Sequence, residues 1–161
     1  MAQTMLSFME AQLEQLDFAG ELNLNWDTSI RSFEIEIKMT GQVNDLAIDD
    51  QQGQTQDQQV DYEDAILLYD QTSIDGQDYQ DNYLAILAFD GHRGMTQATL
   101  AGLFTYLQSL LDEGMSDFLD FLDPQLEIDT FQLTWSQDQL AAAIAAEPED
   151  LQTIFLPYPR H

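Results

Sequence analysis

The sequence contains no cysteine and very little positive charge. Without cysteine, disulfides, thiolate nucleophiles and zinc sites with sulfur ligands are excluded. Proteins that bind nucleic acid neutralise its phosphates with lysine and arginine, so a chain with few of either is not expected to bind nucleic acid directly. The 161 residues include only four such side chains, which are Arg31, Lys38, Arg93 and Arg160.

Long apolar runs are missing as well. No stretch approaches the roughly 20 apolar residues that a membrane-spanning helix needs. The first residues carry no basic region or apolar run of the kind found in a signal peptide, and Glu10 and Glu14 interrupt them. Anionic lipids also repel a negatively charged surface. We therefore expect a cytoplasmic protein that does not associate with membranes.

Acidic side chains dominate what is present. Thirty aspartates and glutamates give a formal net charge of −26. The hydrophobic fraction of 44% nevertheless matches that of globular proteins, so the chain can bury enough apolar surface to offset its conformational entropy. The length fits one domain, which we expect to cover residues 1–161. The charge favours solubility and would attract basic proteins or peptides.

Apolar residues at helical spacing predict four helices. In the longest one, Gly102 suggests a close packing contact, because a glycine inside a helix costs about 1 kcal/mol relative to alanine. Gly114 is expected to end this helix. Ser136 opens the last helix, because Gln139 completes the spacing of a capping box. The predicted helices cover residues 4–16, 95–112, 116–122 and 136 to about 146.

Two kinds of apolar pattern predict strands. Strict alternation in residues 22–26 and 33–39 predicts a hairpin with one apolar face and one charged face. Continuous apolar runs in residues 65–69 and 83–89 predict strands that are covered on both faces, with residues 70–82 connecting them as antiparallel neighbours. The full set of predicted strands covers residues 22–26, 33–39, 46–48, 65–69, 83–89 and 128–135.

Strands and helices are largely segregated along the chain, which is typical of an α+β protein. We predict a mostly antiparallel sheet of about five to six strands, with helices packed on one face. Residues 49–59 are rich in glutamine and aspartate and are predicted to form an exposed loop. Residues 147–161 form an apolar C-terminal tail, which should pack on its own domain or on a second subunit.

Clustered carboxylates are the main candidates for a metal-binding or catalytic site. Those on the polar side of the predicted short helix, and just before it, have the oxygen ligands that magnesium and calcium prefer. The candidate metal ligands are Asp112, Glu113, Asp117 and Asp120. With 30 acids in the chain, chance clusters are expected, so a solvated acidic face is the favoured interpretation.

Other candidates carry weaker signals. His92 follows Asp90 in a predicted turn, but no serine stands in the context of a nucleophile, so a turn role is favoured over catalysis. Asp61, Glu63 and Asp64 precede a buried strand, where a carboxyl group can have a raised pKa or pair with an arginine. The alternative is that they are polar residues at the exposed start of the strand. The sequence predicts no catalytic residue and no cofactor.

Three passages resemble an uncharacterised family of small acidic proteins. They are residues 61–70 (DYEDAILLYD), residues 110–122 (LLDEGMSDFLDFL) and the strand end at residues 25–27 (NWD). The family is a domain of unknown function from lactic acid bacteria and related Firmicutes. The resemblance spans most of the chain and implies a globular fold, and it implies no active-site residue.

The leading hypothesis is a non-enzymatic binding or regulatory module that engages a basic protein or peptide. A chaperone-like role and a homodimer both stay open. The first alternative is a carboxylate-dependent metal hydrolase, which requires the four candidate ligands to converge on one ion. The second is a mimic of DNA, which requires the negative charge to be concentrated along one face.

Overall fold

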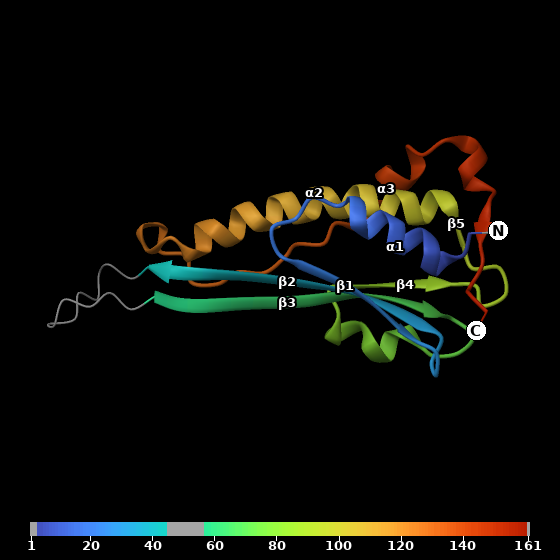
Figure 1. Ribbon diagram of the computed structural model, residues 1–161, viewed down its shortest axis with the longest axis horizontal. Coiled ribbons are helices and arrows are strands. Elements are labelled where there is room, and N and C mark those ends of the chain that lie inside the picture. The colour runs from blue at the N-terminus through green and yellow to red at the C-terminus, as the bar shows by residue number, and fades with distance from the viewer. Residues whose placement is uncertain (1–2, 45–56, 161) are drawn as a thin grey trace, which may run out of the picture.

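A four-stranded sheet forms the frame of the protein (Figure 1). The computed structural model describes residues 3–44 and 57–160. The strands, in spatial order, are β1 (Glu21–Asp27), β2 (Ser32–Asn44), β3 (Asp57–Asp70) and β4 (Ala85–Phe89). β1, β2 and β3 pair antiparallel, as expected.

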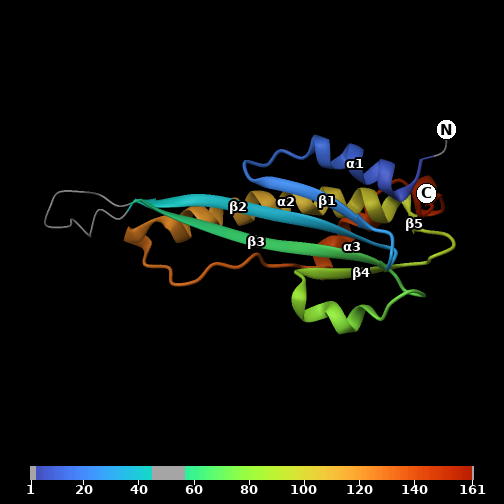
Figure 2. The ribbon, with the colours of Figure 1, turned by 60° about the horizontal axis from the view of Figure 1, so that its bottom comes forward.

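The pairing of β4 differs from the prediction, because it runs parallel to β3. The chain between them does not turn back directly. It crosses the outer face of the sheet through the 3₁₀ helix η1 (Gly76–Asn82), which lies on the side opposite the long helix (Figure 2). The Leu84 N–H then donates to the Ala65 carbonyl at 2.8 Å, which starts β4 beside the middle of β3.

The alternation in β2 sets which face of the sheet is buried. Phe33, Ile35, Ile37 and Met39 are all at most 1% exposed, and they point into one core. β1 places Leu22, Leu24 and Trp26 opposite the first three of them, on the same face. The predicted hairpin is therefore confirmed.

Three α-helices among the described residues cover that face (Figures 1 and 2). The Thr4 side chain caps α1 (Met5–Gln15), and the Ser136 side chain caps α3 (Gln137–Ala145) by accepting from the Gln139 N–H. Both helices were predicted. Gly102 lies against α3, where an added Cβ would come within 2.6 Å of the Ile144 Cα, so the close contact suggested for it is confirmed.

The long helix does not end at Gly114, which corrects the sequence prediction. α2 (Gln97–Leu122) runs for 26 residues and includes the segment predicted as a separate short helix. An added Cβ on Gly114 would come within 2.3 Å of the Leu133 Cδ2. The glycine therefore serves a close contact between α2 and a distant segment, and its backbone stays helical.

No strand forms over residues 128–135, where one was predicted. Phe131 and Leu133 pack against the core, as strand residues would, but the backbone finds other partners. The Leu133 N–H donates to the Tyr62 hydroxyl at 3.1 Å, and the Ser136 N–H donates to the Tyr106 hydroxyl at 2.6 Å. A side-chain oxygen thus satisfies a donor within this segment that a further strand would have used in a ladder, and another holds the residue that follows it.

The main sheet therefore has four strands rather than five or six. A separate pair consists of β5 (Met95–Thr96) and β6 (Phe155–Leu156), which are antiparallel. The predicted strand at residues 46–48 lies outside the described residues, as does most of the predicted loop at 49–59. Residues 57–59 belong to β3.

The C-terminal segment lies against its own chain. Leu156 and Tyr158 are buried, and the Met5 N–H donates to the Pro157 carbonyl at 2.9 Å. β6 is preceded by the 3₁₀ turn η3 (Glu149–Gln152), and the end of α2 is followed by a similar turn, η2 (Pro124–Leu126). Within the described part of the chain, no helix is both long and apolar enough to cross a membrane.

Candidate functional site

Arg31 lies at the turn between β1 and β2 in a conformation that is uncommon for a residue with a side chain. Its φ is +51°, in the left-handed region. The Arg31 carbonyl accepts a hydrogen bond from the Asp70 N–H at 3.2 Å, which ties this turn to the end of β3. Such conformations persist only where the surrounding structure holds them, and they concentrate at functional sites.

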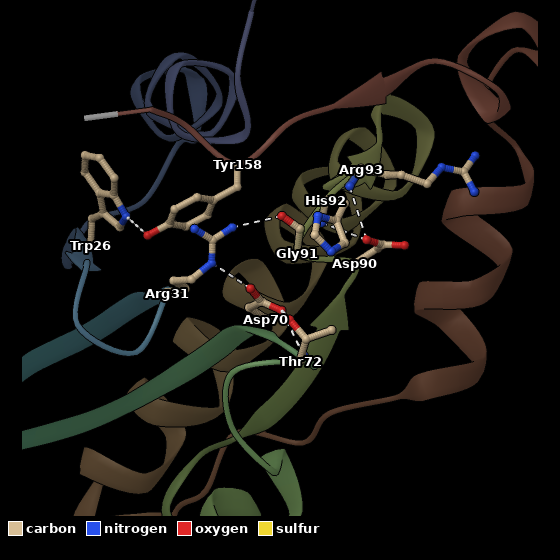
Figure 3. A network of polar contacts seen from close by, with 9 residues as sticks. All are labelled: Trp26, Arg31, Asp70, Thr72, Asp90, Gly91, His92, Arg93 and Tyr158. Carbon is tan, nitrogen blue, oxygen red and sulfur yellow. Dashed lines mark hydrogen bonds and ion pairs between the residues drawn. The ribbon is translucent and has the colours of Figure 1, made fainter.

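Three groups hold the Arg31 guanidinium in place (Figure 3). Nε donates to the Asp70 Oδ2 at 2.7 Å, and Nη2 donates to the Gly91 carbonyl at 2.8 Å. The guanidinium carbon also lies 4.0 Å from the centre of the Tyr158 ring. The side chain is therefore oriented before any ligand arrives, although it is still 39% exposed.

Arg31 and the groups that hold its guanidinium, Asp70, Gly91 and Tyr158, form what we call the Arg31 corner. Asp70 anchors this corner and is buried, at 2% exposed. Its Oδ1 accepts from both the N–H and the hydroxyl of Thr72, at 2.8 and 2.6 Å. Burial alone would raise the pKa of Asp70, but the hydrogen bonds from Thr72 and Arg31 outweigh burial, and the pKa lies below its ordinary value. Asp70 is therefore a carboxylate at neutral pH, and it pairs with the guanidinium.

Tyr158 connects the tail to the same corner. Its hydroxyl accepts from the Trp26 Nε1 at 2.6 Å, and its ring stacks on Phe89 with centroids 6.0 Å apart. Phe33 lies 5.6 Å from the Tyr158 ring, measured between centroids. Residues from β1, β2, β4 and the C-terminal segment thus meet in one aromatic cluster under Arg31.

His92 projects from the turn between β4 and β5, next to this network (Figure 3). The Asp90 carboxylate accepts the backbone N–H groups of His92 and Arg93, at 2.8 and 3.2 Å. These bonds lower the pKa of Asp90. Asp90 thus shapes the turn through its backbone, in line with the turn role predicted for His92.

The outer face of the sheet is the second notable region. We call it the acidic sheet face, and it comprises the outward-pointing acids of β1, β2 and β3. The Lys38 Nζ lies 3.9 Å from the Glu63 Oε1, a surface pair of the kind that contributes little to stability. A cavity of about 220 Å³ opens on this face among Glu21, Glu36 and Glu63. The members whose side chains the structure describes are Glu21, Asp27, Glu34, Glu36, Asp61 and Glu63.

The acids before the buried part of β3 do not pair with an arginine in the described structure. Glu63 faces Lys38, and Asp64 accepts the Tyr62 hydroxyl at 2.8 Å. Burial is the main reason that the pKa of Tyr62 rises to about 12, and the nearby Asp64 carboxylate raises it further. Asp61 and Glu63 point outward and Asp64 points to the core side, so strand alternation separates the three.

The candidate metal ligands are not brought together. All four acids are exposed side chains of α2, and Asp112 accepts from the Gln108 amide at 2.9 Å. Across residues 3–44 and 57–160, no three histidine, aspartate or glutamate side chains are placed to share a metal ion. The residues of this set are Asp112, Glu113, Asp117 and Asp120.

Comparison with known proteins places the chain in a family. The model of a family described as a protein of unknown function (DUF3013) matches residues 1–160. The chain belongs to this family. The resemblance that the sequence suggested, to an uncharacterised family of Firmicutes, is confirmed.

A solved structure of another protein agrees with the fold. It is described as the crystal structure of a conserved protein of unknown function from Enterococcus faecalis, and it is 30% identical to this chain. The match has a TM-score of 0.82 and covers 99% of this chain and 97% of the other. A search of curated proteins found no significant match. None of these comparisons assigns an activity to the chain.

The sequence did not reveal the Arg31 corner of this family member. Its contacts join residues 39 and 60 positions apart, which no local pattern can show. The signal in the sequence was the scarcity of positive charge. The chain has only four lysines and arginines, and three of them lie at this end of the molecule.

Proposed function

We propose that the protein is a non-enzymatic binding module whose acidic sheet face docks a basic protein or peptide. The observation that supports this proposal is the segregation of charge. Arg31, Arg93 and Arg160 lie together at the end of the molecule where the C-terminal segment packs. Among its described side chains, the acidic sheet face has six carboxylates, and one lysine, Lys38, lies among them.

The geometry of a sheet concentrates this charge. Alternate residues of one strand are about 7 Å apart, and neighbouring strands are about 5 Å apart. Both distances are below the Debye length of about 8 Å at physiological salt, so the potentials of neighbouring carboxylates add up. η1 covers only the part of this face near β4, and the rest is open to solvent (Figure 2). An open acidic surface of this kind suits an extended basic segment.

The distribution of negative charge also distinguishes among the hypotheses of a homodimer, a DNA mimic and a regulatory or chaperone-like protein. Two copies of the acidic sheet face would repel each other, so we do not propose it as the interface of a homodimer. Acids also line the exposed side of α2, on the other side of the sheet, whereas mimicry of DNA requires the charge along one face. Regulatory and chaperone-like roles both fit the proposal, because each needs contact with a basic segment.

Two charge-matched variants test this proposal. The first carries four substitutions on the acidic sheet face, and the second carries four on α2, so each raises the net charge by four. The face variant is Glu21→Gln, Glu36→Gln, Asp61→Asn and Glu63→Gln, and the helix variant is Asp112→Asn, Glu113→Gln, Asp117→Asn and Asp120→Asn. The probe is a fluorescein-labelled peptide of alternating lysine and glycine, and its dissociation constant is measured by fluorescence anisotropy.

The face variant is expected to bind the peptide about tenfold more weakly than the wild type, because each exposed ion pair contributes up to about 1 kcal/mol. The helix variant is expected to bind within about threefold of the wild type, a difference of less than 1 kcal/mol. Equal weakening in both variants would mean that the peptide responds to net charge alone, and it would contradict a docking face.

A further inference from the structure

A cavity at the arginine-rich end has a lining unlike the rest of this acidic surface. Its volume is about 440 Å³, and it lies between the β1–β2 turn, the turn after β4 and the C-terminal segment. Arg31, His92 and Arg160 contribute to its lining, and no carboxylate does. By contrast, a cavity of about 420 Å³ near the start of β4 is lined by both Asp64 and Asp81. In a chain with 30 acids and four lysines and arginines, a cavity with two arginines and no acid requires an explanation.

Arg31 is prepared to bind an additional acceptor. Its Nε and Nη2 are directed at Asp70 and Gly91, while Nη1 has no hydrogen-bond partner in the described part of the chain. Nη1 therefore keeps two N–H donors, and charge-assisted bonds from a guanidinium to a carboxylate are among the stronger hydrogen bonds in proteins. Because the guanidinium plane is already fixed by its contacts with the protein and the Tyr158 ring, little conformational entropy is lost on binding.

The remaining lining narrows the class of ligand. Pro157, Pro159 and the Tyr158 ring supply apolar walls beside the cationic groups. Asp70 offsets the charge of Arg31, so Arg160 provides the surplus positive charge, and that surplus is small. The net charge of −26 also opposes the approach of ligands with several negative charges. A small positive surplus, the free Nη1 donors and apolar walls together favour a singly charged organic acid.

We propose that this cavity binds the carboxylate of a small organic monoanion, with the Nη1 end of Arg31 and the Arg160 side chain as donors. The apolar body of the ligand lies against the two prolines and the tyrosine ring. The cavity volume is within the range of small-molecule sites, about 300–1,000 Å³. This site is independent of the docking face proposed above, because it differs in location and in the sign of its charge.

Binding of 4-fluorobenzoate, followed by ¹⁹F NMR, tests the proposal. The matched neutral probe is 4-fluorobenzamide, which keeps the ring and removes the charge. We expect saturable binding of the benzoate, at least about fivefold tighter than the amide, which corresponds to about 1 kcal/mol. Inorganic phosphate is expected to compete poorly. No saturation at tens of millimolar, equal binding of both probes, or efficient competition by phosphate would each overturn the proposal.

Two arginine variants localise the site. Arg160→Gln removes a donor from the cavity, and it is expected to weaken benzoate binding about fivefold. Arg93→Gln is the control, since it removes the same charge from the same end of the molecule. Arg93 stacks on Phe155 and does not line the cavity, so binding should be unchanged. Both side chains are exposed, and thermal unfolding checks that both variants are folded. Equal effects of the two substitutions would contradict the site.

Discussion

Replacing Asp70 with alanine is expected to lower the free energy of unfolding by about 3 kcal/mol. The substitution removes the acceptor of both Thr72 hydrogen bonds and the partner of the Arg31 guanidinium. A charge that loses its buried partner typically costs about 3–5 kcal/mol, and the partial exposure of Arg31 places this case at the lower end.

Urea denaturation measures this effect against a charge-matched control. Asp117→Ala also removes one negative charge, but from an exposed position on α2, and it should change stability by no more than about 0.5 kcal/mol. If both substitutions had the same small effect, the Arg31–Asp70 pair would not anchor the corner.

The lowered pKa of Asp70 gives this prediction a pH dependence. A carboxyl whose pKa is lower in the folded state than in the unfolded one, where it is about 3.9, adds stability above that value. This contribution is lost as the pH falls through the folded pKa. The stability difference between the wild type and Asp70→Asn should therefore shrink below about pH 4. A difference that stays constant into acid would show that the charge of Asp70 is not what stabilises the corner.

The second large effect is expected from Phe33→Ala, at about 3–5 kcal/mol. Phe33 is fully buried, and its ring lies 6.2 Å from both Trp26 and Phe89, measured between centroids. Removal of the ring leaves a cavity at the point where the sheet meets the tail. The control is Leu119→Ala, which truncates a large apolar side chain that is 58% exposed and should cost no more than about 0.5 kcal/mol. Equal losses would contradict the position of the core.

Those parts of the fold that depend on neighbouring residues could be predicted from the sequence. The hairpin of β1 and β2 follows from alternation, because a period of two places one set of side chains on the buried face. The start of α3 follows from Ser136, whose side chain accepts from the Gln139 N–H three residues later. α1 follows from the helical spacing of its apolar residues. Each of these signals lies within a few positions of the element it defines.

The errors arose where distant contacts override a local signal. Glycine often follows the end of a helix, so Gly114 was predicted to end one. In the structure the Leu133 side chain occupies the space where a Cβ would be, and the helix continues past it. Residues 128–135 have the alternation of a strand, but the Tyr62 hydroxyl accepts the Leu133 N–H within this segment. The Tyr106 hydroxyl accepts the N–H of Ser136, the residue that follows it. The parallel course of β4 depends on where η1 crosses the sheet, which composition does not specify.

In the two proposed functional regions, too, features set by local sequence could be predicted and features set by distant contacts could not. The acidic sheet face could be anticipated, because alternation of charged and apolar residues along β2 implies a charged outer face. The arginine-rich cavity could not, since it requires Arg31, Gly91 and Tyr158 to meet from three distant parts of the chain. The candidate ligands on α2 were a cluster in sequence only, and in the structure they are exposed side chains of one helix.

Backbone NMR with the lysine–glycine peptide tests the central claim, which is that a basic segment docks on the acidic sheet face. We expect the peptide to shift the amide signals of β1, of β2 up to Thr40 and of residues 59–64, and to leave those of α2 nearly unchanged. Shifts concentrated on α2, or spread evenly over the acidic surface, would contradict the claim.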